Sequence, residues 1–218
     1  MIKIKKNGFT LSEMLITLSV VGLLGVLVLP GLIKDTTSKA SITLLQSTVS
    51  SINDAVQNEI MKTRATTIQD TNIYKSPKKF LESMDAVNIE DNTKSLFYNN
   101  EYKSLNGTKK AIGSNVTASA ILKNGVGINL VTEEDNKRTL INIDINGIKE
   151  PNIIGVDLFS LILWWENDFD NNQHMGDLGA KRDNSSFETL KTECNKGDDL
   201  ACYYLLEASG FNHNYMKK

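Results

Sequence analysis

Apolar residues are concentrated in one uninterrupted block near the start of the chain. Residues 14–33 contain no charged side chain, and about 20 apolar residues in a helix suffice to cross the roughly 30 Å hydrocarbon layer of a membrane. Lys3, Lys5 and Lys6 precede the block, and basic residues on one flank favour keeping that flank in the cytoplasm. The pattern predicts a membrane-spanning helix with the bulk of the chain on the other side.

A cleaved secretory signal is the first alternative for this block. Such a signal has an apolar core of about 7–15 residues followed by a small-residue cleavage site. The block is longer than that, and the residues after it read KDTTSKAS. In addition, Glu13 stands at its edge, and a carboxylate close to hydrocarbon is costly enough that it usually has a partner or a function.

A second helical pattern follows the block. Apolar side chains recur at spacings of three and four residues and form one stripe, made of Leu45, Val49, Ile52, Val56 and Ile60. This spacing is typical of an amphipathic helix that packs on a core. We therefore expect one long helix from about residue 10 to about residue 62.

The second half of the chain has the pattern of β-strands. Apolar runs at 119–122, 126–131, 139–145 and 158–165 are separated by short polar turns. Asn-Gly at 124–125 is a strong hairpin signal, because both residues accept positive φ, and short connections favour antiparallel pairing. Four antiparallel strands packed on a long helix predict an α+β fold. Ser76-Pro77 also predicts the start of a short helix, since proline suits the first helical turn.

The N-terminal sequence KKNGFTLSEMLITLSVVGLLGVLVLP resembles the start of a type IV prepilin or a type II secretion pseudopilin. In that family a short basic leader ends in glycine, a membrane peptidase cuts after it, the new N-terminal Phe is N-methylated, and the apolar helix is retained. The resemblance places the cut between Gly8 and Phe9 and aligns Glu13 with the family's glutamate. Gly22 and Pro30 fall where many type IV pilins carry residues that loosen the helix.

The resemblance implies a type IV pilin-like fold and a domain organisation. The leader would be residues 1–8, the transmembrane and filament-core helix 9–33, and the amphipathic continuation 34–62. Residues 63–218 would form the globular head. Proline in a helix removes a hydrogen bond and clashes with the preceding turn, so we expect the long helix to be kinked.

The implied function is structural: a pseudopilin or minor pilin that is assembled from the bacterial inner membrane into a pilus or a secretion pseudopilus. The implied partners are the prepilin peptidase and N-methyltransferase, other subunits, an inner-membrane assembly platform and membrane lipid. Which filament is formed stays open. The alternative is a single-pass anchored ectodomain that binds a ligand without polymerising.

Glu13 distinguishes these two functions. The free α-amine of a processed Phe9 is cationic near neutral pH, so it can pair with Glu13 of a neighbouring subunit. A half-made ion pair in a low dielectric is costly, and the pair would therefore favour one assembly register. The other interpretation of Glu13 is a solvated residue that caps the helix.

The segment IDINGIKEPNIIGVDLF at 143–159 is the best candidate for a ligand site. It offers the oxygen atoms of Asp144, Asn146 and Asp157 between glycine turns, but it lacks the further oxygens and the terminal Glu of an EF-hand loop. Two interpretations stay open: a turn-rich connection between two strands, or a calcium site, which some pseudopilins carry in their heads. We expect no other cofactor.

Cys194 and Cys202 are the only cysteines in the chain. An exported head meets an oxidising compartment in many bacteria, and the polar tail at 166–218 has little core of its own. The pair also resembles the disulfide-bounded C-terminal region of many pilins. We therefore expect a Cys194–Cys202 bond, with two free thiols as the alternative.

Composition excludes little but points away from catalysis and from nucleic acid. The 218 residues include 24 basic and 26 acidic side chains, a formal net charge of −2, and such a balance gives no general attraction to nucleic acid. His174 and His213 lie in polar contexts, and the chain carries no nucleophile elbow, phosphate-binding loop or zinc motif. We expect a protein that is not an enzyme.

Overall fold

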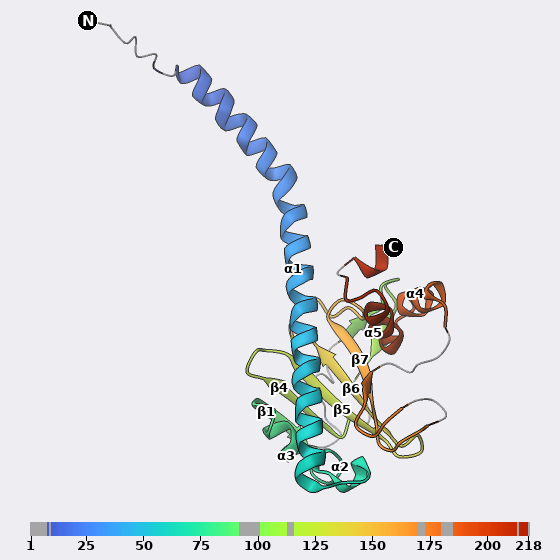
Figure 1. Cartoon of the computed structure of the whole chain (residues 1–218). Helices are drawn as coiled ribbons and strands as arrows, with labels where there is room; N and C mark the ends of the chain where they lie inside the picture. Colours follow the sequence, from blue (N-terminus) through green and yellow to red (C-terminus); the bar gives the residue numbers. More distant parts are fainter. Residues whose placement is uncertain are drawn as a thin grey trace, which may run out of the picture. The chain divides into compact units, whose positions relative to one another are not determined.

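The structure is a computed structural model that describes residues 8, 10–91, 101–112, 116–169, 173–179, 185–212 and 214–217. The chain divides into two compact units, residues 1–40 and 41–218. Helix α1 (Leu11–Thr63) begins in the first unit and ends in the second (Figure 1). Its bounds confirm the long helix that the sequence predicts.

The first part of α1 exposes its apolar side chains. Leu11–Val28 is a helical segment long and apolar enough to cross a membrane, and none of it is buried within the protein. An exposed apolar surface of this extent marks a membrane or protein contact. The helix continues through Gly22 and Pro30, so a local opening or kink there stays a prediction.

The second part of α1 packs into the head, as the apolar stripe predicts. Leu45, Ile52 and Val56 are buried, and Val49 and Ile60 are partly buried against the same core. The helix ends at Thr63, and Arg64 then adopts a positive φ of 52°. Three short helical segments follow: η1 (Ile68–Asp70), α2 (Asn72–Lys75) and α3 (Pro77–Glu82). Pro77 occupies the first turn of α3, as expected.

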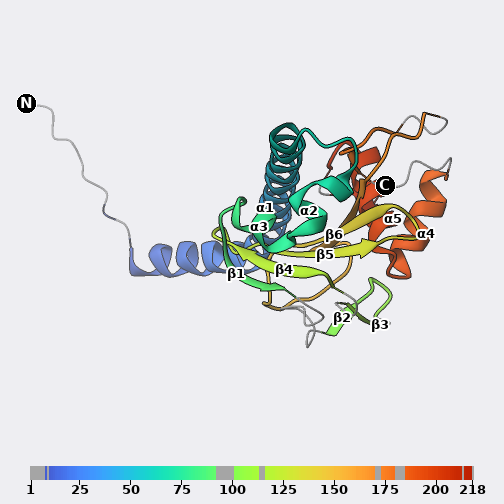
Figure 2. The ribbon, with the colours of Figure 1, turned by 90° about the horizontal axis from the view of Figure 1, so that it is seen from below.

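The head contains an antiparallel six-stranded sheet in the order β1-β4-β5-β6-β7-β8. Its strands are β1 (Ala86–Asp91), β4 (Ala118–Leu122), β5 (Gly127–Glu133), β6 (Arg138–Asp144), β7 (Leu158–Trp164) and β8 (Leu178–Gly179). A separate hairpin joins β2 (Glu101–Lys103) to β3 (Lys109–Ala111). Figure 2 shows α2, α3 and the head portion of α1 on one side of the sheet and this hairpin on the other. The architecture is α+β, as predicted.

The described head has more strands than the four that the sequence predicts. The sequence predicts β4, β5, β6 and β7, because each is a clear apolar run, but it misses β1, β8 and the β2–β3 hairpin. β1 lies at the sheet edge with Val87 exposed, and its register slips between Ala86 and Asn88, which disturbs its alternation. β8 has two residues and the hairpin strands three each, too few for a recognisable period.

Two C-terminal helices complete the head. They are α4 (Phe187–Asn195), which Ser186 caps, and α5 (Asp199–Ala208), which Asp198 caps. α5 packs against β7, and the hydroxyl of Ser160 on β7 donates to the Asp199 carboxylate at 2.7 Å. A 3-10 turn, η2 (Tyr215–Lys217), follows α5. The tail thus packs on the core of the sheet.

Candidate functional site

The start of α1 carries a reciprocal cap built from Thr10 and Glu13. The backbone N–H and the hydroxyl of Thr10 donate to Glu13 Oε2 at 2.8 and 2.7 Å. In return, the Glu13 N–H donates to Thr10 Oγ1 at 3.2 Å. This is a capping box, in which side chains satisfy backbone N–H groups that have no partner inside the helix.

The capping box bears on both interpretations of Glu13. Within the single chain, Glu13 is an exposed cap residue. Its carboxylate also lies in the first turn of the helix, four residues after Phe9, where processing would leave a cationic amine. Gly8 is exposed with open space around it, and Phe9 lies outside the described residues. The structure therefore places the cap and leaves the intersubunit pair as a prediction.

Gly22 lies in the exposed apolar stretch of α1, with nothing within 4 Å of the point where a side chain would begin. Within the part of the chain that the structure describes, no close contact requires a glycine there. Pro30 lies within α1, and its side chain falls outside the described residues. Their assembly roles stay predictions.

In the head, the structure brings Asp144, Asn146 and Asp157 together. Asp144 ends β6, Asp157 directly precedes β7, and the two strands are paired. The Asn146 N–H donates to Asp144 Oδ1 at 3.1 Å, and its side-chain amide lies 3.4 Å from Asp157 Oδ2 and 3.1 Å from the Pro151 carbonyl oxygen. The side chain of Asn146 thus links the turn that follows β6 to the residues that precede β7.

Both carboxyl groups of this pair are buried and accept further hydrogen bonds. The hydroxyl of Tyr102, on β2, donates to Asp144 Oδ2, and the Ile153 N–H donates to Asp157 Oδ1 at 2.8 Å. Asp144 is 1% exposed and Asp157 5%. The sequence does not indicate Tyr102, because β2 lies some 40 residues from Asp144 in a stretch without a clear pattern.

Burial raises the pKa of both carboxyl groups. Loss of hydration raises the pKa of Asp144 to about 6 and that of Asp157 to about 7, where the nearby Asp144 charge adds to the effect. The hydrogen bonds from Tyr102 and from backbone N–H groups act in the opposite direction but are outweighed. The pair therefore takes up protons close to neutral pH.

The arrangement can hold the segment together with protein donors alone. Each of the four carboxylate oxygens of the pair faces an N–H or O–H donor of the chain, which is the position that a cation would otherwise take. Asn146 Oδ1 is buried without a hydrogen-bond partner. Among the described residues, no group of three or more His, Cys, Asp or Glu side chains is placed to hold a metal.

Cys194 and Cys202 are joined as a disulfide between α4 and α5. Both are fully buried, and their sulfurs pack against the backbone of Gly155. A β-carbon at Gly155 would lie 2.7 Å from Cys202 Sγ and 3.0 Å from Cys194 Sγ. The sequence predicts the cysteine pair but gives no indication of this contact.

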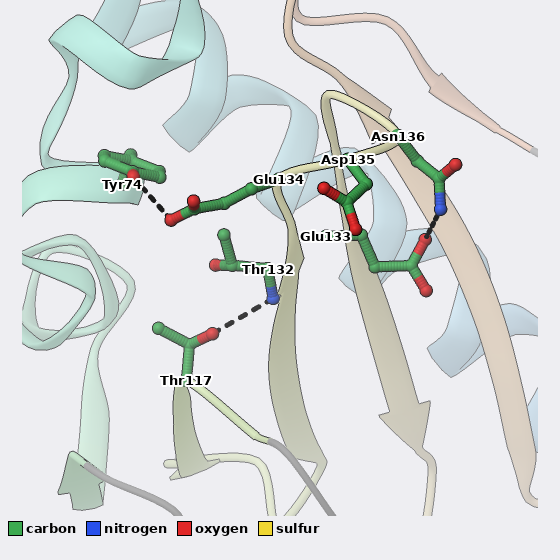
Figure 3. A pocket seen from close by; sticks show the side chains of 7 residues that line it. All are labelled: Tyr74, Thr117, Thr132, Glu133, Glu134, Asp135 and Asn136. Atoms are coloured by element: carbon green, nitrogen blue, oxygen red, sulfur yellow. Dashed lines mark hydrogen bonds between the residues drawn. The ribbon is translucent and has the colours of Figure 1, made fainter.

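A polar hollow of about 770 Å³ lies beside the β5–β6 turn (Figure 3). The Tyr74 hydroxyl donates to Glu134 Oε1 at 2.7 Å across it, and Thr117 Oγ1 accepts from the Thr132 N–H at 3.0 Å. Asp135 and Asn136 complete the rim at the turn itself. The hydrogen bonds between these lining residues leave an acidic rim and no further candidate chemistry among them.

His174 and two lysines of the head contact nearby acidic or backbone groups. His174 is exposed, with Nδ1 3.4 Å from Asp177, and His213 falls outside the described residues. Lys109 pairs with Glu101 at 2.6 Å, and Lys110 Nζ donates to the Gly197 carbonyl at 2.8 Å. These contacts are typical of a solvated protein surface.

Comparison with known proteins finds a family match at the start of the chain. Residues 3–29 match the family described as the prokaryotic N-terminal methylation motif. The chain has no significant match among curated proteins or solved structures. The motif indicates a structural subunit rather than an enzyme, and together with the apolar start of α1 it fits a membrane-anchored pilin. The chain thus carries the N-terminal signature of the type IV pilins and pseudopilins.

Proposed function

We propose that the protein is a structural subunit, a pseudopilin or minor pilin, of a type IV pilus-like or type II secretion filament. The observation that carries this proposal is the combination of a processing motif at residues 3–29 with an apolar helix surface, Leu11–Val28, that the chain itself does not bury. A retained helix of this kind can exchange lipid contacts for contacts with neighbouring helices.

The proposal gives the segment two successive environments. Before assembly, the helix holds the subunit in the bacterial inner membrane, with the leader in the cytoplasm and the head outside. The prepilin peptidase and N-methyltransferase removes residues 1–8 and methylates Phe9. An assembly platform then transfers the subunit to the filament, where other subunits replace the lipid.

Glu13 serves as the recognition group of this transfer. The N-terminal amine of an incoming subunit is cationic, and Glu13 of its neighbour is the acid at the edge of the apolar segment. A charge that is left unpaired in low dielectric is strongly unfavourable. The pair therefore selects one axial position of the new subunit.

The capping box allows the two roles of Glu13 to be separated. In the Glu13→Gln variant, the amide oxygen can still accept from Thr10, as glutamine does in natural capping boxes, but the charge is lost. In the matched Thr10→Val variant, the hydroxyl contacts are lost and the Glu13 charge is kept. We expect Glu13→Gln to insert into the membrane normally and to abolish filaments, and Thr10→Val to assemble.

The amount of filament from each variant, measured by electron microscopy and immunoblotting, decides between the roles. Filaments from Glu13→Gln together with failure of Thr10→Val would show that Glu13 acts through the cap alone. Normal assembly of both variants would show that neither the charge of Glu13 nor the cap sets the assembly register. Absence of filaments from the wild-type protein would favour the single-pass anchored ectodomain, which does not polymerise.

The DxNG segment of the head, at 144–147, makes us favour a pseudopilin or minor pilin over a major pilin. Disruption of the chain in its host tests which filament it serves. Loss of surface filaments with secretion intact would assign a pilus, and blocked secretion with surface filaments intact would assign a pseudopilus.

A further inference from the structure

The C-terminal disulfide packs against one turn of the chain, residues 153–158. The backbone of Gly155 lies against both sulfurs, at distances that leave no room for a β-carbon. Tyr215, on η2, contacts the same glycine: its hydroxyl donates to the Gly155 carbonyl oxygen. Gly155 has a φ of +81°, a conformation that favours glycine. Three elements of the tail therefore hold this residue.

A short hydrogen-bonded path leads from Gly155 to Asp157. The Gly155 N–H donates to the Leu158 carbonyl at 2.9 Å, and the Asp157 N–H donates to the Ile153 carbonyl at 3.1 Å. The Asp157 carboxylate closes the turn by accepting from the Ile153 N–H, and the Asp157 carbonyl accepts from the Ile145 N–H at 2.8 Å. A displacement of Gly155 thus moves Asp157 relative to the end of β6.

We propose that the Cys194–Cys202 disulfide positions the buried carboxyl pair, Asp144 and Asp157, through the Gly155 turn, so that the oxidation state of the disulfide and the ionisation of the pair are coupled. This inference is independent of whether the subunit polymerises. On this proposal, formation of the disulfide is the step that brings Asp144 and Asp157 into their final positions in the head.

Reduction of the Cys194–Cys202 disulfide changes the space available to the turn at residues 153–158. A dithiol reductant supplies two electrons and two protons: the Cys194–Cys202 bond breaks, two thiols form, and the reductant closes to its own disulfide. Non-bonded atoms settle about 3.5–4.0 Å apart, so the two sulfurs must separate. Because Gly155 lies against both, the separation displaces the turn and moves Asp157 away from Asp144.

The coupling works in both directions, because linkage is reciprocal. The oxidised head holds the two carboxyl groups together in a buried site, which favours their protonated forms. In the reduced head the Asp157 carboxyl gains water and distance from Asp144, and its pKa falls toward the ordinary range of aspartate.

Hydrogen exchange of the full-length protein in detergent micelles, read by mass spectrometry, tests the path. We expect reduction by a dithiol to speed exchange in residues 145–158 by about tenfold or more, a local opening, while β5 and β6 keep their protection. A disulfide that merely staples the tail would change exchange in α4 and α5 alone, and that result would overturn the proposal.

Matched glycine variants isolate the contact from the redox chemistry. Gly155→Ala should open residues 145–158 in the oxidised protein, because its β-carbon meets both sulfurs. Gly107→Ala is the control: its φ of +87° imposes the same backbone strain, but nothing lies within 4 Å of its β-carbon. Equal effects of both variants on residues 145–158, or no effect of either, would contradict the proposal.

Carbon-13 NMR of labelled aspartate carboxyls measures the pKa of Asp157 directly. A disulfide that only stabilised the tail would leave this pKa unchanged. The Asp157 resonance, assigned with Asp157→Asn, should titrate at lower pH in the reduced protein than in the oxidised one. If reduction also removes protection from β5 and β6, the oxidised Tyr215→Phe variant decides: it should open residues 145–158 selectively, and unchanged exchange there would overturn the proposal.

Discussion

At the residue scale, burial of two carboxyl groups in one segment makes the stability of the head depend on pH. The pKa of Asp144 is raised to about 6 and that of Asp157 to about 7, whereas the unfolded value is about 3.9. Between about pH 4 and 7 the folded state therefore binds more protons than the unfolded state. The free energy of unfolding then falls as pH rises through this window.

We expect the melting temperature of the full-length protein, in detergent and chelator, to fall between pH 5 and pH 8. The contribution of the pair over this range is on the order of 4 kcal/mol, or roughly ten degrees. Asp157→Asn should flatten the slope, because the amide still accepts from the Ile153 N–H but carries no charge. Equal slopes for the two proteins would contradict the assignment.

The same residues give a prediction about calcium. Because protein donors already face all four carboxylate oxygens, we expect the melting temperature at pH 7.5 to be the same in millimolar calcium and in chelator. A cation that binds the native state alone would raise it with concentration. A rise that Asp157→Asn abolishes would show instead that calcium displaces the Asn146 amide.

The convergence of Asp144, Asn146 and Asp157 was predictable from sequence, since two strands bracket them. The burial of the two carboxyl groups and the contact of Asp144 with Tyr102 were not, because a hydrogen bond between β2 and β6 depends on tertiary packing and leaves no local pattern. The same holds for Gly155: a glycine turn is visible in the sequence, but the sulfurs that require it lie some 40 residues away.

At the scale of elements, the buried stripe of α1 is what attaches the helix to the head. Ile52→Ala removes a fully buried side chain and should lower the free energy of unfolding by about 2–5 kcal/mol. Met61→Ala on the same helix removes a side chain that is 66% exposed and should change it by less than about 0.5 kcal/mol. Denaturant unfolding in detergent measures both, and equal losses would contradict the packing of α1.

The disulfide between α4 and α5 gives a chemical prediction. Non-reducing peptide mapping of the protein taken from the native envelope should find Cys194 and Cys202 in one linked pair. Cross-linking removes conformational freedom from the unfolded chain, although a short loop such as this gains only modestly. Two thiols that react with an alkylating agent before reduction would contradict the bond.

The sequence predicts those elements whose apolar period runs over several residues. The 53-residue helix and the central strands β4, β5, β6 and β7 are of this kind. It fails for β8 and the β2–β3 hairpin, whose strands of two or three residues are too short to show a period. It fails for the edge strand β1 because a slip in register disturbs its alternation.

At the scale of the whole molecule, the head and the N-terminal segment serve different purposes. The head, within residues 41–218, buries its own core. The apolar surface of Leu11–Val28 is left for a membrane or for neighbouring subunits. The N-terminal methylation motif that overlaps this surface fits its exposure, because the proposed function retains the segment after the leader is removed.

The identity of the mature N-terminus tests this account most directly. Mass spectrometry of the membrane-extracted protein should find a chain that begins with N-methylated Phe9, and a bulky residue in place of Gly8 should leave the leader attached, because its side chain crowds the scissile peptide. An intact Met1 in the wild-type protein, or a cut after residue 33 that removes the apolar helix, would contradict the account.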